Sequence, residues 1–211
     1  EMNTRLQVEH GVSELCFGID IVRAQLAIAE GGRMSSIFPS KFESRGHAIE
    51  VRLCSEDPFS GYLPQIGRIH ALCLPSGANI RVDTGISVGS EVSTSFDSLI
   101  AKILVWGEDR HEALERLTTA LRQTVVHGVV TNLPLLLALS SDPEVAEGSV
   151  TTTWLESSTP LEKLTIDISE LASAIRSGHW LEGPPLRPLQ KAGSQNHFSS
   201  HIFVKDRRFL P

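Results

Sequence analysis

The sequence has few cysteines, no long apolar run and no excess of basic residues. Its three cysteines are odd in number and widely spaced, which argues against a disulfide framework and favours reduced, mostly buried thiols in the cytoplasm or a mitochondrial matrix. The apolar run at residues 133–139 is far shorter than the roughly 20 residues of a membrane span, and the polar N-terminus predicts no signal peptide. A formal net charge of -6 argues against nucleic acid as a partner.

What the sequence does contain is a globular composition, with 41% hydrophobic residues and alternating signals for helices and strands. Helices are predicted over residues 19–30, 109–123 and 132–140. Strands are predicted over residues 1–10, 47–53, 67–74, 79–83, 91–106 and 125–130. Asp109 and Glu112 have capping-box spacing at the start of the second helix. The pattern therefore predicts an α+β fold with a mostly antiparallel sheet.

The first ten residues place charged and amide side chains at every second position. If this stretch is a strand, one face carries a polar row. The row consists of Glu1, Asn3, Arg5, Gln7 and Glu9. The opposite face carries Met2, Leu6 and Val8, which can anchor the strand to a core.

Two interpretations of this polar row remain open on spacing alone. It is either the solvated face of a surface strand or the wall of a functional site. In a site, carboxylate and amide oxygens suit Mg²⁺, and an arginine holds a planar oxyanion. A second carboxylate could serve as a general base if its pKa were raised.

Four separate motifs, in the same order, resemble the biotin carboxylase family. They are EMNTRLQVEH at residues 1–10, GHAIEVR at 46–52, SFDSLIAK at 95–102 and GVVTNL at 128–133. In that family the first motif closes the active site of an ATP-grasp domain, and the other three belong to the C-terminal domain. The resemblance covers residues 1–156.

The resemblance implies three parts. Residues 1–44 would be the trailing end of an ATP-grasp domain, residues 45–156 the biotin carboxylase C-terminal domain, and residues 157–211, which are rich in proline and glycine, a linker or poorly ordered tail. The glycine-rich loop over the ATP phosphates, the nucleotide-binding lysines and the first metal carboxylate have no counterpart in the sequence. We therefore expect a C-terminal fragment that does not turn over alone.

The resemblance also assigns roles to matching residues. Glu1 and Asn3 resemble ligands of Mg²⁺ or Mn²⁺, which would bind together with ATP. Gln7 and the backbone of Val8 resemble contacts to bicarbonate.

Three further residues match the family's catalytic groups. Glu9 matches the base that deprotonates bicarbonate before its attack on ATP forms carboxyphosphate. Arg5 matches the arginine that holds bicarbonate and steadies negative charge on the biotin ureido oxygen, and Arg52 matches the arginine that stabilises the biotin enolate. Such preplaced guanidinium groups act as oxyanion-hole donors do.

The resemblance implies a carrier domain that bears biotin, a carboxyltransferase subunit and a homo-oligomer, with no nucleic acid and no membrane. Residues 83–85, 91–93 and 103–106 resemble acyl-CoA carboxylases of the methylcrotonyl-, propionyl- and acetyl-CoA kinds. Residues 10–12 look more like urea carboxylase. A non-catalytic dimerisation or scaffold module, or a paralogue that binds a partner, is a further alternative, and the chain has no site for its own biotinylation.

Other polar residues are predicted to be structural. Asp97 and Lys102 are expected on one strand, where they could form an ion pair or a subunit contact. His10, His47 and His127 share no metal-ligand spacing and are expected to be structural histidines.

Overall fold

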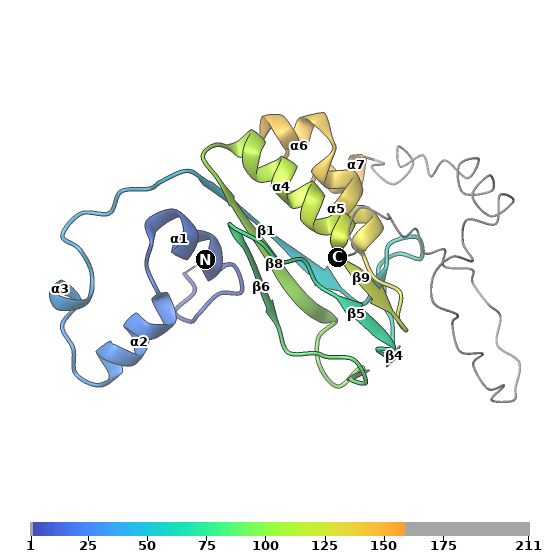
Figure 1. Cartoon of the computed structure of the whole chain (residues 1–211), viewed down its shortest axis with the longest axis horizontal. Helices are drawn as coiled ribbons and strands as arrows, with labels where there is room; N and C mark the ends of the chain where they lie inside the picture. The colour runs from blue at the N-terminus through green and yellow to red at the C-terminus, as the bar shows by residue number, and fades with distance from the viewer. Residues whose placement is uncertain (1, 159–211) are drawn as a thin grey trace, which may run out of the picture. The chain divides into compact units, whose positions relative to one another are not determined.

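A computed structural model describes residues 2–158, and a three-stranded antiparallel sheet lies at the centre of this part (Figure 1). Its strands, in spatial order, are β1 (His47–Cys54), β8 (Leu99–Gly107) and β6 (Ile80–Thr84). The central strand β8 is buried over nearly its whole length, because it is apolar except at Lys102 and is covered on both faces. The predicted α+β class with an antiparallel sheet is confirmed.

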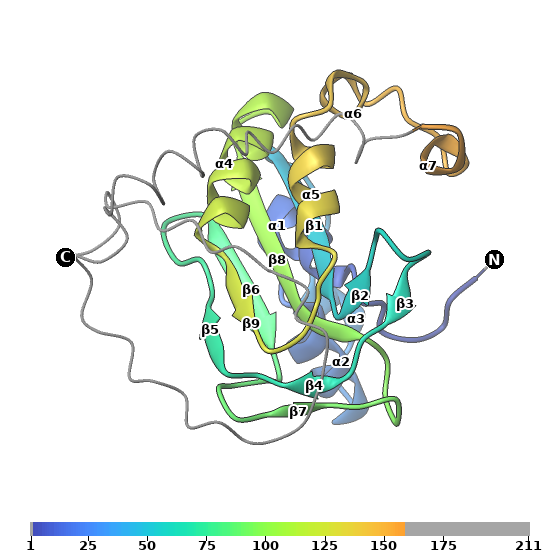
Figure 2. The same ribbon diagram turned by 90° about the vertical axis from the view of Figure 1, so that its right-hand side faces the viewer.

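Helices α4 and α5 cover one face of this sheet (Figure 2), and α6 packs against both helices. Their bounds are α4 (Arg110–Gln123), α5 (Leu133–Ser140) and α6 (Pro143–Glu147). The buried cluster between helices and sheet consists of Leu53, Ile100, Ala101, Ile103, Val105, Leu117, Ala120, Leu121 and Leu136. The Asp109 side chain caps α4 by accepting a hydrogen bond from the backbone N–H of Glu112 at 2.9 Å, as the capping-box spacing predicts.

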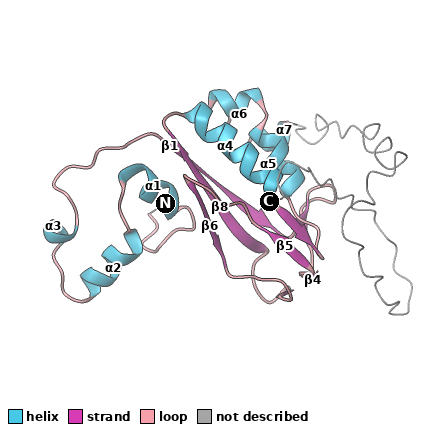
Figure 3. Cartoon of the chain, viewed as in Figure 1, coloured by secondary structure: helices cyan, strands magenta, loops and turns pink. Residues whose placement is uncertain are grey.

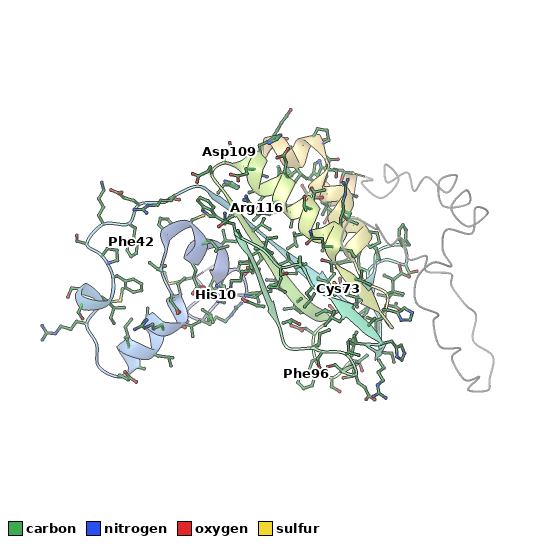
Figure 4. All side chains as sticks on the ribbon, in the orientation of Figure 1. His10, Phe42, Cys73, Phe96, Asp109 and Arg116 are labelled. Carbon is green, nitrogen blue, oxygen red and sulfur yellow. The ribbon has the colours of Figure 1, made fainter. Side chains whose placement is uncertain are left out.

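The opposite face of the sheet receives α1, which contacts both β1 and β8. The N-terminal helices are α1 (His10–Phe17), α2 (Ile21–Ala29) and α3 (Met34–Ile37). After α3 the chain returns to α1. The Phe42 ring packs edge-on against Phe17, with centroids 6.1 Å apart, and the Arg45 N–H donates to the Cys16 carbonyl at 2.8 Å. Figure 4 labels Phe42 on this returning segment.

Three short antiparallel strand pairs and one short helix complete the described part. They are β2 (Glu56–Asp57) with β3 (Leu63–Pro64), β4 (Gly67–Arg68) with β7 (Glu91–Val92), β5 (Ala71–Cys73) with β9 (Val125–His127), and the helix α7 (Trp154–Ser157). Within residues 2–158, no helix has both the length and the apolar character needed to cross a bilayer.

The predicted N-terminal strand is wrong. Residues 2–9 form no strand (Figure 3), and α1 follows at once where no helix was predicted. A strand needs a neighbouring backbone to satisfy its N–H and C=O groups, and the described residues offer residues 2–9 no such partner. Met2 and Leu6 do not anchor a core, since Met2 is 87% exposed and Leu6 is also exposed.

Two long predicted strands are interrupted. Residues 67–74 divide into β4 and β5, and residues 91–106 divide into β7 and β8, with a turn-containing loop before β8. The prediction of mostly buried cysteines is also wrong in part, because Cys73 is exposed on the short strand β5 while Cys16 and Cys54 are half-buried. The amphipathic stretch at 168–175, like the rest of the predicted tail beyond residue 158, lies outside the described residues.

Candidate active site

A row of charged side chains crosses the sheet on the face that receives α1. The strand register pairs Arg52 of β1 with Lys102 of β8, and Lys102 with Asp83 of β6. Directly paired residues project from the same face of a sheet. A guanidinium, an ammonium and a carboxylate therefore lie side by side, and Figure 4 shows His10 at the start of α1 on this side of the sheet.

Glu9 faces this row and forms an ion pair with Arg52. Both side chains are about half-exposed, so the pair is open to solvent. The Glu9 backbone N–H, followed by Arg52 and Arg5, lowers the pKa of Glu9 below its ordinary value. Glu9 is therefore a carboxylate at neutral pH, with two arginines near enough to act on its charge.

Lys102 links the sheet to the segment before α1. Its Nζ donates to the Val8 carbonyl at 2.9 Å and lies 3.2 Å from Asp83 Oδ2. The Lys102 side chain is only 11% exposed, so these two oxygens provide the partners that a buried ammonium requires.

A second network holds α1 in place. The Arg81 guanidinium donates two hydrogen bonds of 2.9 Å to the Asp83 carboxylate and one of 2.6 Å to Glu14 Oε2. Glu14, 8% exposed, accepts from the Ile21 N–H at 2.7 Å through its other oxygen. One buried carboxylate thus joins α1, the first turn of α2 and β6. The hydrogen bond from Arg81 also lowers the pKa of Asp83.

Glu50 occupies the same face of β1, two residues before Arg52. Both of its carboxylate oxygens are buried and receive no hydrogen bond. Burial raises the pKa of Glu50, and the nearby charge of Glu9 raises it further, while Lys102 and Arg52 oppose the shift. A carboxylate buried without hydrogen bonds is energetically costly when it is ionised, and this one lies near the charges of Glu9 and Arg52.

The structure brings together some of the sequence-predicted site residues and leaves others apart. Glu9, Arg52 and the Val8 carbonyl meet at the charged row. Asn3 is half-buried, whereas Arg5 and Gln7 are exposed; within residues 2–158 none of these three side chains forms a hydrogen bond. Glu1 lies outside the described residues.

Several contributors to the site were missed or misassigned. Asp97 does not pair with Lys102: it is exposed in the turn before β8, and the register gives Lys102 to Asp83 instead. Pairing β6 with β8 would have revealed this contact, but a sequence does not state which strands are neighbours. The alternation of β1 could have placed Glu50 beside Arg52.

The described residues do not form a complete metal site. Residues 2–158 contain no group of three or more His, Cys, Asp or Glu side chains arranged to hold a metal ion. Of the two predicted ligands only Asn3 is described, and one amide oxygen falls short of the coordination that Mg²⁺ demands.

Comparison with known proteins bears directly on this arrangement. The profile of the biotin carboxylase C-terminal domain matches residues 50–157, and that of the ATP-binding domain of the carbamoyl-phosphate synthase L chain matches residues 1–37. The chain belongs to the biotin carboxylase family. The resemblance noted from the sequence motifs is therefore confirmed, and the Glu9–Arg52 contact joins the two matched stretches.

Individual relatives agree with this membership. One relative is the biotin carboxylase domain of the Hydrogenobacter thermophilus 2-oxoglutarate carboxylase, which was crystallised as a dimer with MgADP, ADP and bicarbonate. It is 41% identical and superposes with a TM-score of 0.72, over 74% of this chain and 34% of that chain. The urea carboxylase of Kluyveromyces lactis is 36% identical, with a TM-score of 0.69 over 74% of this chain and 14% of that chain.

A third relative aligns beyond the described residues. The mitochondrial methylcrotonoyl-CoA carboxylase subunit alpha of Rattus norvegicus is 35% identical over 213 residues, which cover 99% of this chain and 29% of the relative. This biotin carboxylase chain spans about a third of the length of the curated relatives first matched.

Proposed function

We propose that the chain forms one wall of the active site of a biotin-dependent carboxylase, a ligase that uses ATP and bicarbonate to carboxylate biotin on a carrier domain. The Glu9–Arg52 ion pair carries the proposal. Glu9 lies in the stretch that matches the ATP-binding domain and Arg52 in the stretch that matches the C-terminal domain. The contact thus joins an ionised carboxylate and a guanidinium from both regions on an exposed surface that a small anion can reach.

In this proposal Glu9 is the general base. Its lowered pKa keeps it ionised but also makes it a weaker base, so transfer of the bicarbonate proton to Glu9 relies on the arginines to stabilise the anion that forms. Arg5 and Arg52 bind the oxyanion and later meet the negative charge on the biotin ureido oxygen, as preorganised donors do in other enzymes. Bound MgATP supplies the phosphoryl group that activates bicarbonate.

In this proposal the other residues assigned from the family resemblance help to bind bicarbonate and the metal. Gln7 and the Val8 backbone contact bicarbonate, and Glu1 with Asn3 contributes to the metal held with the nucleotide. The fixed position of Val8 beside Glu9 supports the bicarbonate assignment, because the Val8 carbonyl is anchored on Lys102.

The proposed final acceptor is an acyl-CoA, of the methylcrotonoyl-CoA kind. The alignment with the rat methylcrotonoyl-CoA carboxylase subunit, which runs through 99% of the chain, supports this acceptor. The glycine at position 11 had favoured urea carboxylase. A Cβ there would lie 2.3 Å from Leu104 Cδ2, so local packing already accounts for the glycine.

The proposed partners are a biotin carrier domain, a carboxyltransferase subunit and a second copy of the biotin carboxylase. The dimeric relative from Hydrogenobacter supports self-association. The proposed location is the cytoplasm or a mitochondrial matrix, which the three free thiols of Cys16, Cys54 and Cys73 support.

The experiment measures bicarbonate- and biotin-dependent ATP cleavage by the complete carboxylase subunit that carries these residues. Arg5→Ala is expected to lower kcat/KM by about 100-fold or more, because an oxyanion donor is lost. Arg33→Ala, at an arginine of the α2–α3 connection, serves as the matched control and is expected to behave as wild type. Equal activity of both variants would contradict the assignment of Arg5, and a folded but inactive wild-type subunit would favour a scaffold role.

A further inference from the structure

Lys102 places a buried positive charge in the middle of the central strand. Every other residue of β8 is apolar or glycine, and an ammonium at such a position is costly unless it is paired. Its two partners are the Val8 carbonyl at 2.9 Å and Asp83 Oδ2 at 3.2 Å. The first partner belongs to a segment that has no strand or helix of its own to hold it.

The peptide between Val8 and Glu9 is held through its carbonyl oxygen. Its carbonyl oxygen accepts from Lys102, and the next residue along the chain, Glu9, forms the ion pair with Arg52. A peptide unit is planar, so holding its oxygen also restricts the backbone from which the Glu9 side chain projects. The orientation of the Glu9 carboxylate therefore depends on Lys102.

We propose that Lys102 is a positioning residue for Glu9: by holding the Val8 carbonyl, it fixes the backbone from which the Glu9 carboxylate reaches Arg52. This inference rests on the proposed function of Glu9 as the base. It assigns Lys102 a part in catalysis without contact to any reactant, and it explains why a charged residue interrupts an otherwise apolar strand.

Charged or titratable side chains surround Lys102 on the neighbouring strands and on the N-terminal segment. Arg52 and Glu50 face it from β1, Asp83 and Arg81 lie on β6, and Glu9 and His10 lie on the segment above the sheet. Within residues 2–158, Lys102 is the side chain that donates to the Val8 carbonyl. A neutral side chain of equal length at position 102 would leave that oxygen without its donor and Asp83 without one of its two cations.

The test compares Lys102→Met, which keeps the length of the stem, with Lys102→Arg, which keeps the charge and the donor. Lys41→Met is the control, because Lys41 is exposed on the segment before β1. Rates of bicarbonate-dependent ATP cleavage are measured against pH in the complete subunit. Hydrogen exchange at the backbone amides of residues 7–11 is measured in the 211-residue chain.

Lys102→Met is expected to lower kcat by on the order of 100-fold, as misplacement of a reacting group does, with the KM for ATP unchanged. The acid limb of its pH profile should move to higher pH, because a Glu9 carboxylate that is displaced from Arg52 loses a cation that lowers its pKa. Amides 7–11 should exchange faster, and Lys102→Arg should restore both properties substantially.

A purely structural role would lower the melting temperature without moving the pH profile. The inference is overturned if Lys102→Met matches the Lys41→Met control in kcat and in exchange at residues 7–11. If Lys102→Met does not fold, the Lys102→Arg variant provides the test. The inference is also overturned if Lys102→Arg folds and has wild-type exchange at these amides but has no activity. Absence of activity in the wild type would instead refute the proposed function, and the exchange experiment would still decide whether Lys102 holds the segment.

Discussion

Glu50 shows how a single side chain can make stability depend on pH. Its carboxylate is buried without a hydrogen bond, and burial raises its pKa above the ordinary value of 4.5. A carboxyl group with a raised pKa in the folded state binds its proton more tightly there than in the unfolded chain. Its contribution to stability is therefore fully present below the unfolded pKa and is lost as the pH rises through the folded pKa.

The substitution Glu50→Gln should remove the loss of folding stability that occurs as the pH rises. The variant is expected to unfold at a higher urea concentration than wild type at about pH 7, and the difference should shrink or reverse near pH 4, where Glu50 is protonated. Urea unfolding of the 211-residue chain at several pH values measures this. Glu147→Gln, at an exposed residue at the end of α6, is the control, and an equal pH response in both variants would refute the explanation.

Residue types were more predictable from the sequence than residue contacts. The family motifs identified Glu9 and Arg52 as site residues, and the structure brings these two into an ion pair. The partners of Lys102 were not predictable, because Val8 and Asp83 lie 94 and 19 residues away in the chain. Strand register brings Asp83 to Lys102, and the docking of the segment before α1 brings Val8 to it; both depend on packing that no local pattern encodes.

At the scale of elements, the docking of α1 depends on one glycine. A Cβ at Gly11 would lie 2.3 Å from Leu104 Cδ2 and 3.5 Å from Glu50 Oε2. Because Leu104 is fully buried on β8, it has little room to move away. The helix must therefore shift if position 11 gains a side chain.

Gly11→Ala is expected to destabilise the chain and to disturb the Glu9–Arg52 pair. Alanine normally stabilises a helix by about 1 kcal/mol relative to glycine, but overpacking costs typically about 1–3 kcal/mol, so the overlap should outweigh the helical gain. Ser13→Ala on the same helix is the control. Urea unfolding measures the stability, and a Gly11→Ala variant more stable than wild type would show that Leu104 adapts freely.

Elements with a strong local signal were predicted well, and those without one were not. Helix α4 has fourteen residues, a capping Asp109 and five buried apolar positions on one face, so its pattern is unambiguous. Helix α1 has eight residues, no capping hydrogen bond from its N-cap residue Glu9, and Gly11 near its start. Its position depends on Glu14 and Arg81 rather than on helix propensity, which is why the alternation before it was mistaken for a strand.

At the scale of the whole described part, the core residues and the proposed site residues lie on opposite faces of the sheet. One face packs Ile103 and its strand neighbours against α4 and α5, while the other presents Arg52, Lys102 and Asp83 to α1. Because strand side chains alternate between faces, residues 102 and 103 are adjacent in sequence yet serve opposite sides.

Ile103→Ala is therefore expected to lower the free energy of unfolding by about 2–5 kcal/mol, as other large-to-small core changes do. The kcat of the complete subunit, measured well below its melting temperature, should change little. Ile66→Ala, at an exposed isoleucine, is the control. A loss of kcat as large as that of Lys102→Met would show that the two faces are not independent.

The contacts between the N-terminal segment and the sheet also constrain how such chains can recombine during evolution. The pairs Glu9–Arg52, Glu14–Arg81 and Val8–Lys102 each join a residue before position 38 to one after position 46. A recombination event that exchanges one of these stretches between relatives would split both side-chain pairs at once, whereas the backbone of any residue at position 8 supplies the carbonyl for Lys102. Hybrids that swap only the first stretch should work when the donor supplies compatible partners at these positions, so the two stretches are constrained to evolve as a unit.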